Sequence, residues 1–142
     1  MARYEHLPIF RAAFDLAVHM EKIVRHFSRY HKFTIGTELR NHSQKVLSQV
    51  IVANNTVQRE PVLLALRQEL EQFKVLSRLC HESGGFASVK SYLFVAERIV
   101  DLAKQNEGWL KQTTGQTTTA PVRSARRAVW SGETGYGQNR NG

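Results

Sequence analysis

Apolar residues recur at intervals of three and four along most of this chain, which places them on one face of an α-helix. Strict apolar–polar alternation, which would indicate strands, is absent. The first series begins after Pro8, and proline suits the first position of a helix. It predicts one helix from Pro8 to about His31, with a buried face formed by Ile9, Ala13, Leu16, Met20, Ile23, Phe27 and Tyr30.

Three further apolar series predict three more helices. The second helix follows a break at Thr34–Thr37, where Gly36 is a poor helix former. Its buried face is predicted to contain Leu39, Val46, Val50, Ile51, Ala53 and Val57. The third begins at Glu60–Pro61 and ends at Ser83–Gly85, because glycine commonly caps helix ends. Its predicted buried residues are Leu63, Leu66, Leu70, Phe73, Ser77 and Cys80.

The fourth series predicts a helix that buries Val89, Leu93, Ala96, Val100, Ala103 and Leu110. Lys90, Glu97, Lys104 and Lys111 recur every seven residues on its outer side. Four amphipathic helices joined by short connections predict an all-α, up-down-up-down four-helix bundle over residues 1–112.

The composition changes at Thr113. Residues 113–142 are rich in Thr, Gly, Gln, Ser and Asn, and they cannot bury enough apolar surface to order themselves. Arg123, Arg126 and Arg127 precede Trp130 in this segment. We therefore expect a disordered, basic C-terminal tail that can contribute to binding.

A strong positive charge indicates affinity for polyanions. The chain has 20 Lys and Arg against 12 Asp and Glu, a net charge of +8. On the predicted first helix, one stripe opposite the apolar face holds four cations, here called the basic ridge: Lys22, Arg25, Arg29 and Lys32. Arg40, Lys45 and the tail residues Arg123, Arg126 and Arg127 are further candidate nucleic-acid-binding residues.

Other features bear on compartment and chemistry. The single Cys80 excludes an intramolecular disulfide. The first ten residues do not resemble a signal peptide, and no run of roughly 18 apolar residues could span a bilayer. We expect a soluble protein of the cytoplasm. His19 and His26 would lie about 10 Å apart along a helix, too far to chelate one ion. No metal site, cofactor or catalytic constellation is predicted.

Two alternatives to a nucleic-acid-binding scaffold stay open. Arg25 and His31 have the R-x5-H spacing of small helical HEPN nucleases, in which the motif sits late in the bundle. That resemblance implies an RNA-cleaving enzyme. The second alternative is a protein-only adaptor whose charge merely keeps it soluble. RNA cleavage and salt-dependent RNA binding would separate these hypotheses.

Phe14 and Val18 lie outside the main apolar face of the predicted first helix. A bundle helix with apolar residues on two sides often has a second packing partner, and in a small domain that partner is often another subunit. We therefore expect Phe14 and Val18 to lie at an oligomer interface.

Three segments carry a family resemblance: Tyr4–Phe14 (YEHLPIFRAAF), Thr37–Arg40 (TELR) and Val50–Asn54 (VIVAN). They resemble the four-helix-bundle family of ribosomal-RNA intervening-sequence proteins, over about residues 4–112. Within it, the basic charge and overall pattern are most similar to the accessory variability determinant (Avd) branch from diversity-generating retroelements, including phage-encoded ones. The chain departs from many bundle relatives at the end of the second helix, where it has Asn54–Gln58 (NNTVQ) instead of Asn-Ile-Ala-Glu-Gly.

The resemblance implies a non-enzymatic partner of a reverse transcriptase. Members of this branch form a homopentameric barrel that associates with the polymerase and its template RNA, and cDNA is a further candidate ligand. They support the adenine-mutagenic cDNA synthesis of mutagenic retrohoming, which diversifies a target gene. For this chain we therefore expect a basic scaffold in the bacterial host cytoplasm, without membrane association.

Overall fold

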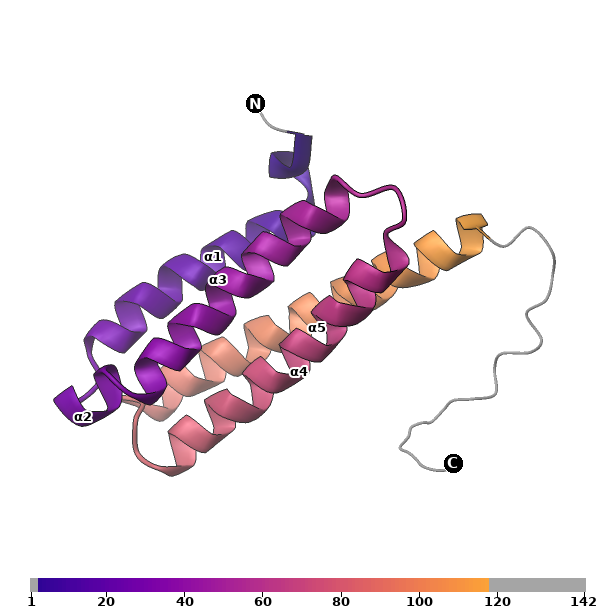
Figure 1. Ribbon diagram of the computed structural model, residues 1–142. Coiled ribbons are helices and arrows are strands. Elements are labelled where there is room, and N and C mark those ends of the chain that lie inside the picture. Colours follow the sequence, from indigo (N-terminus) through magenta and orange to yellow (C-terminus); the bar gives the residue numbers. More distant parts are fainter. Residues whose placement is uncertain (1–2, 118–142) are drawn as a thin grey trace, which may run out of the picture. The chain divides into compact units, whose positions relative to one another are not determined.

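The computed structural model describes residues 3–117, and within them every regular element is helical. A short 3-10 turn, η1 (Arg3–His6), precedes five α-helices (Figure 1). These are α1 (Pro8–Arg25), α2 (Arg29–Lys32), α3 (Ile35–Asn54), α4 (Glu60–Glu82) and α5 (Val89–Thr117). The four long helices alternate in direction, which confirms the up-down-up-down bundle. The predicted tail from residue 118 onward, with Arg123, Arg126 and Arg127, lies outside the described residues.

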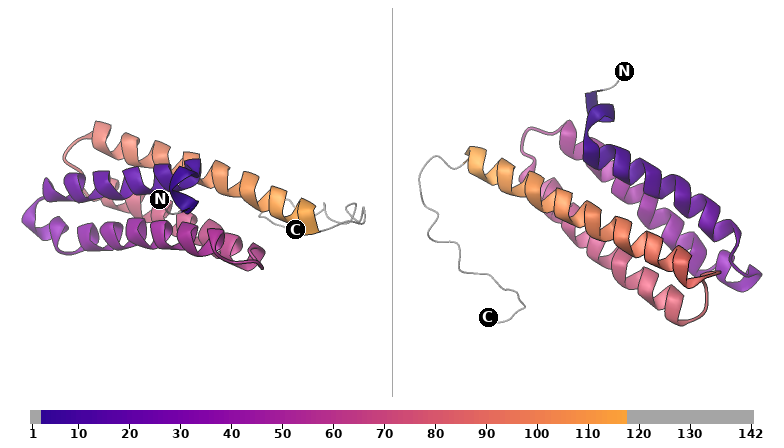
Figure 2. Two further views of the ribbon diagram at one scale, coloured as in Figure 1. Left: turned by 90° about the horizontal axis from the view of Figure 1, so that it is seen from above. Right: turned by 180° about the vertical axis from the view of Figure 1, so that it is seen from behind.

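The chain divides into two units, Met1–Lys111 and Gln112–Gly142, and the bundle belongs to the first. Its helix α1 packs along α3, and α3 packs along α4 (Figures 1 and 2). α5 is hydrogen-bonded to α4 through Asn106, whose amide Nδ2 donates to the carbonyl oxygen of Leu63 at 3.0 Å. The largest fully buried side chains are those of Phe73, Leu16, Met20, Leu39, Leu63, Leu66, Leu70, Ile99 and Leu102. No helix among the described residues is long and apolar enough to cross a bilayer.

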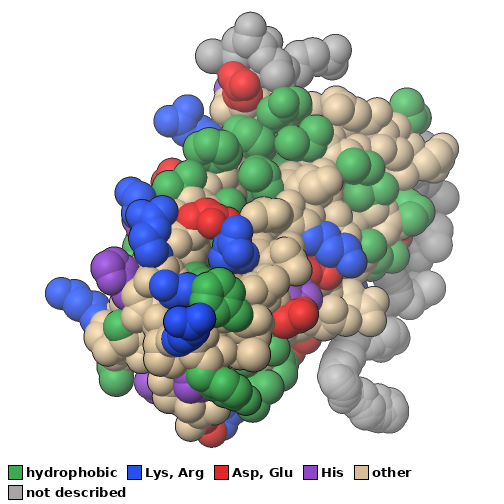
Figure 3. Space-filling model, turned by 60° about the vertical axis from the view of Figure 1, so that its left-hand side comes forward, with side chains coloured by type: hydrophobic (Ala, Val, Ile, Leu, Met, Phe, Trp, Pro, Cys, Tyr) green, Lys and Arg blue, Asp and Glu red, His purple; other side chains and the backbone are tan. Residues whose placement is uncertain are grey.

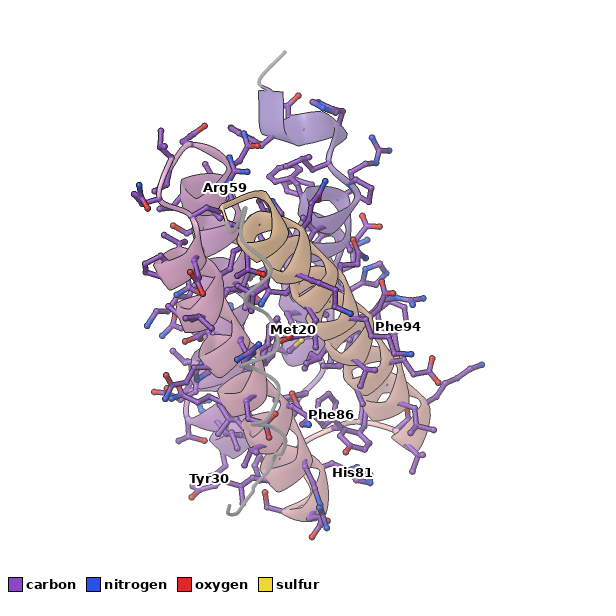
Figure 4. All side chains as sticks on the ribbon, turned by 90° about the vertical axis from the view of Figure 1, so that its right-hand side faces the viewer. Met20, Tyr30, Arg59, His81, Phe86 and Phe94 are labelled. Carbon is purple, nitrogen blue, oxygen red and sulfur yellow. The ribbon has the colours of Figure 1, made fainter. Side chains whose placement is uncertain are left out.

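The first helix is shorter than predicted. α1 ends at Arg25, where the amides of His26 and Phe27 donate to carbonyls three residues back, at 3.1 and 3.0 Å. The Oγ of Ser28 then accepts the amide of His31 at 3.5 Å and caps α2. Because this turn changes the helical phase, Tyr30 is 73% exposed and the prediction that it faces the core was wrong. Figure 4 shows Tyr30 at the outer edge of the bundle, whereas Met20 lies inside it.

The start of the second long helix also differs from the prediction. Gly36 does not break the chain but lies buried in the first turn of α3. A Cβ at this position would lie 2.8 Å from Cγ1 of Val24, so glycine permits a close approach to α1. The far end of the apolar series was overextended, because α3 ends at Asn54 and Val57 is exposed beyond it.

Helix α4 agrees with the prediction throughout. All six residues predicted to be buried are buried: Leu63, Leu66, Leu70, Phe73, Ser77 and Cys80. The helix ends at Glu82, and Gly84 follows with φ +83°, a left-handed conformation that glycine adopts without strain.

The buried face of α5 was predicted correctly only at Leu110, which is buried. Val89, Leu93 and Val100 are exposed. In place of the other predicted residues, the bundle buries an adjacent stripe formed by Val95, Ile99, Leu102 and Asn106, which leads to Leu110. The helix also continues to Thr117, with Thr113 buried one turn beyond Leu110, so residues 113–117 are helical rather than disordered.

Candidate nucleic-acid interface

The end of α1, helix α2 and the beginning of α3 meet at one corner of the bundle. A shallow hollow of about 180 Å³ lies there, between α1 and α3. It is lined by Glu21, Val24, Arg25, Lys32, Phe33 and Arg40. We call this region the α2 corner. We include in it Arg29 and Tyr30, which lie on α2 together with Lys32.

Side-chain hydrogen bonds join α1 to α3 along one side of the hollow. The Nε of Arg40 donates to Oε1 of Glu21 at 2.9 Å. Oε2 of the same carboxylate accepts Nε2 of Gln44 at 3.2 Å. Gly36 lets the two helices approach closely just beside these bonds. Arg40 therefore lines the hollow with its charge already paired to Glu21.

The basic ridge was predicted to run along a single helix, but the structure divides it between two helices. Lys22 and Arg25 lie on α1, whereas Arg29 and Lys32 lie on α2 beyond the turn. Within residues 3–117 none of these four cations has a carboxylate partner. The structure brings Arg25 and Lys32 to the hollow, with Arg40 beside them, while Lys22 and Arg29 stand outside it. Figure 3 shows Lys and Arg side chains gathered on this side of the molecule.

Lys45 lies elsewhere on α3. Its Nζ is 3.6 Å from Oε1 of Glu69 on α4, and Nδ1 of His42 bonds to the other oxygen of that carboxylate. Glu69 is only 5% exposed, so these two contacts compensate a buried charge. The structure therefore does not bring Lys45 to the α2 corner.

Two aromatic side chains at the α2 corner were not recognised as site residues. Tyr30 is 73% exposed and Phe33 is 69% exposed, which makes them the most exposed aromatic side chains among residues 3–117. Phe33 also lines the hollow. Ser28 is the sequence signal that could have revealed them. Serine is a favourable N-cap, so it indicates that a new helix starts there and that the first helix has already ended.

The geometry does not pair Arg25 with His31, the two residues of the R-x5-H spacing. Nδ1 of His31 lies 2.9 Å from Oγ of Ser28, and His31 does not line the hollow that contains Arg25. Among residues 3–117 no three His, Cys, Asp or Glu side chains are grouped so that they could hold a metal ion.

A larger groove, of about 540 Å³, lies between α4 and α5. Its rim holds two carboxylates, Glu71 and Glu107, among four cations: Arg67, Lys74, Lys104 and Lys111. The guanidinium of Arg67 donates through two nitrogens to Glu107, at 2.7 and 2.8 Å, and these bonds raise the pKa of Arg67. Lys74 lies 3.1 Å from Glu71. Because these pairs place two carboxylates on the groove, against Glu21 alone at the hollow of the α2 corner, the groove suits polyanions less well.

The predicted oligomer residues lie on an exposed part of α1. Phe14 is 49% exposed and Val18 is 36% exposed. The ring of Phe14 stacks on Phe10 with centroids 5.9 Å apart, and Phe10 in turn contacts Tyr4 at 4.9 Å. The structure thus joins Phe14 to an aromatic row at the start of α1.

Comparison with known proteins gave no match, either to protein-family models or to curated proteins.

Proposed function

We propose that this protein is a non-enzymatic, basic scaffold that binds nucleic acid and associates with a retroelement reverse transcriptase. The observation that carries the nucleic-acid part is the set of cations without carboxylate partners around the α2 corner: Lys22, Arg25, Arg29 and Lys32. The polymerase, the template RNA or cDNA, and the mutagenic outcome rest on the resemblance of Tyr4–Phe14, Thr37–Arg40 and Val50–Asn54 to the retroelement branch.

The electrostatics of the α2 corner favour a polyanion. Like charges held near one another repel, and a phosphate backbone relieves that repulsion. Binding also releases the counterions condensed on the nucleic acid, so affinity falls steeply with salt. In an oligomer the corners would repeat, and weak contacts would add through avidity. The same resemblance supports a homopentamer acting in the cytoplasm of a bacterial host.

The test of nucleic-acid binding replaces all four cations of the basic ridge by glutamine. Three of them are exposed and Lys32 is partly buried outside the core, so the fold should persist. RNA and DNA affinity should fall, and the log–log salt slope should flatten by roughly one unit for each phosphate that is no longer neutralised. A matched control replaces four cations of α4 and α5, Lys74, Arg78, Lys90 and Lys104, by glutamine and removes the same charge.

If the ridge variant folds and binds as the wild type does, the protein-only adaptor hypothesis gains and this proposal fails. Incubation of RNA with the protein tests the nuclease hypothesis, because new cut ends that disappear in Arg25→Ala and His31→Ala variants would establish an enzyme. The polymerase association is tested by adding the protein to a retroelement reverse transcriptase and its template RNA. Mutagenic cDNA synthesis should depend on the addition.

A further inference from the structure

We propose that the α2 corner binds single-stranded nucleic acid in preference to duplex, by stacking unpaired bases on Tyr30 and Phe33. This inference rests on the proposed function and specifies the form of nucleic acid that the same site takes. It arises from the two aromatic side chains that the turn at His26–Ser28 leaves in solvent.

Exposure of both rings is unusual for side chains of this kind. Aromatic side chains usually bury much of their surface in a core or an interface. Phe27, three residues before Tyr30, does so and contacts Phe86 with ring centroids 5.3 Å apart. Tyr30 and Phe33 are instead 73% and 69% exposed on the same short segment. Two exposed rings beside cations match the composition of single-strand sites, in which bases stack on aromatic side chains along a basic groove.

The rings are carried on an anchored backbone. Oγ1 of Thr34 donates to the carbonyl oxygen of Tyr30 at 2.7 Å, and Oγ1 of Thr37 donates to that of Lys32 at 3.4 Å. The ring of Tyr30 also stands nearly perpendicular to that of His31, with centroids 5.1 Å apart. Because α2 is held at both ends, a stacked base would order little additional chain.

The cations lie where a backbone would follow the stacked bases. Lys32 and Phe33 are neighbours in sequence, and both line the hollow that contains Arg25. A base on Phe33 therefore places its phosphate within reach of these two cations. In a duplex the base faces are covered by their neighbours, so duplex can use only the cations. The same contacts give no readout of base edges, and we expect little sequence preference.

The test compares three labelled DNA ligands that carry the same number of phosphates: a single strand of thymidines, a strand of abasic sites and a duplex. The wild-type protein should bind the thymidine strand about tenfold or more tighter than the abasic strand. A Tyr30→Ala, Phe33→Ala variant should lose that difference while its affinity for the abasic strand stays the same. Leu64→Ala removes an exposed apolar side chain near the start of α4 and should keep the difference.

Each outcome separates this inference from the proposed function. Equal wild-type affinity for thymidine and abasic strands overturns the stacking inference and leaves backbone binding intact. Binding of none of the three ligands overturns both. The wild-type comparison needs no variant. A second double variant, Tyr30→Phe with Phe33→Tyr, keeps both aromatic rings and should preserve the preference for the thymidine strand, whether or not the alanine variant folds. If the alanine variant keeps full strand selectivity but changes its oligomeric mass, the rings belong to a protein interface and the inference fails.

Discussion

Gly36 of α3 lies so close to Val24 of α1 that a Cβ on the glycine would stand 2.8 Å from Cγ1 of the valine. The same atom would lie 2.9 Å from the carbonyl oxygen of His31. Gly36 therefore touches both the end of α1 and helix α2. This packing sets where Arg25, Lys32 and Phe33 meet, so the candidate site depends on the absence of a side chain.

Replacing Gly36 by alanine should destabilise the fold, because one of the two clashing atoms belongs to backbone. We expect a loss of about 1–3 kcal/mol in the free energy of unfolding, measured by urea denaturation. Gly108→Ala in α5 is the matched control, since nothing lies within 4 Å of its added Cβ. It should stabilise by about 0.5–1 kcal/mol through helix propensity. Equal effects of the two substitutions would contradict the packing role of Gly36.

Cys80 should be unreactive in the native protein. Burial raises the pKa of its thiol from 9.0 to about 11, so the thiolate is scarce at pH 8. A disulfide reagent such as DTNB should modify it slowly in buffer and rapidly in denaturant. Because the folded state holds the proton more tightly than the unfolded chain, the thiol's contribution to stability is full below pH 9. It should be lost as the pH rises towards 11.

A Cys80→Ala variant is the control for this pH dependence. It has no thiol, so its unfolding free energy should fall less than that of the wild type between pH 9 and 11. Fast native modification at pH 8 would show that the end of α4 opens readily.

The reliability of sequence inference differed between helices for physical reasons. α4 has one long, regularly spaced apolar stripe, from Leu63 to Cys80, and it is bounded by a proline and a left-handed glycine. Its face and its ends therefore followed from local rules. α5 has two adjacent apolar stripes, and periodicity alone cannot rank them. The polar Asn106 interrupts the buried stripe, and its place in the core depends on its bond to Leu63 in another helix.

The sequence predicted which charged residues form the candidate site, but not how they are arranged. Charged side chains such as those of Lys22, Arg25, Arg29 and Lys32 stay at the surface whichever face of the helix is buried. Their arrangement did not follow from the sequence, because a three-residue turn at His26–Ser28 shifts the phase and moves Tyr30 from the expected core into solvent. Gly36 was interpreted as a helix breaker, whereas its role depends on a neighbour that only the tertiary structure reveals.

The buried carboxylate of Glu69 should be sensitive to loss of His42. This carboxylate is 5% exposed and contacts Nδ1 of His42 and Nζ of Lys45. A His42→Ala substitution removes one partner from a buried charge and should cost about 1–3 kcal/mol of unfolding free energy. The Arg78→Ala control breaks an exposed pair with Glu82 and should leave stability nearly unchanged.

A double-mutant cycle of His42→Ala with Glu69→Ala isolates the interaction, and we expect a coupling of about 0.5–3 kcal/mol. Additive losses within experimental error would mean that the two side chains do not stabilise one another.

The exposed aromatic row on α1 leads to the prediction that the protein is an oligomer. Phe14 is 49% exposed, stacks on Phe10 and lies near Val18 on the same helix, so another subunit could bury all three. Light scattering at micromolar concentration should give a mass several times 16.2 kDa. Phe14→Glu should lower that mass, because a charge buried without a partner opposes association. Val57→Glu places the same charge on a 93% exposed residue after α3 and should leave the mass unchanged. A monomeric wild-type protein would refute the prediction, and equal effects of the two glutamates would remove Phe14 from the interface.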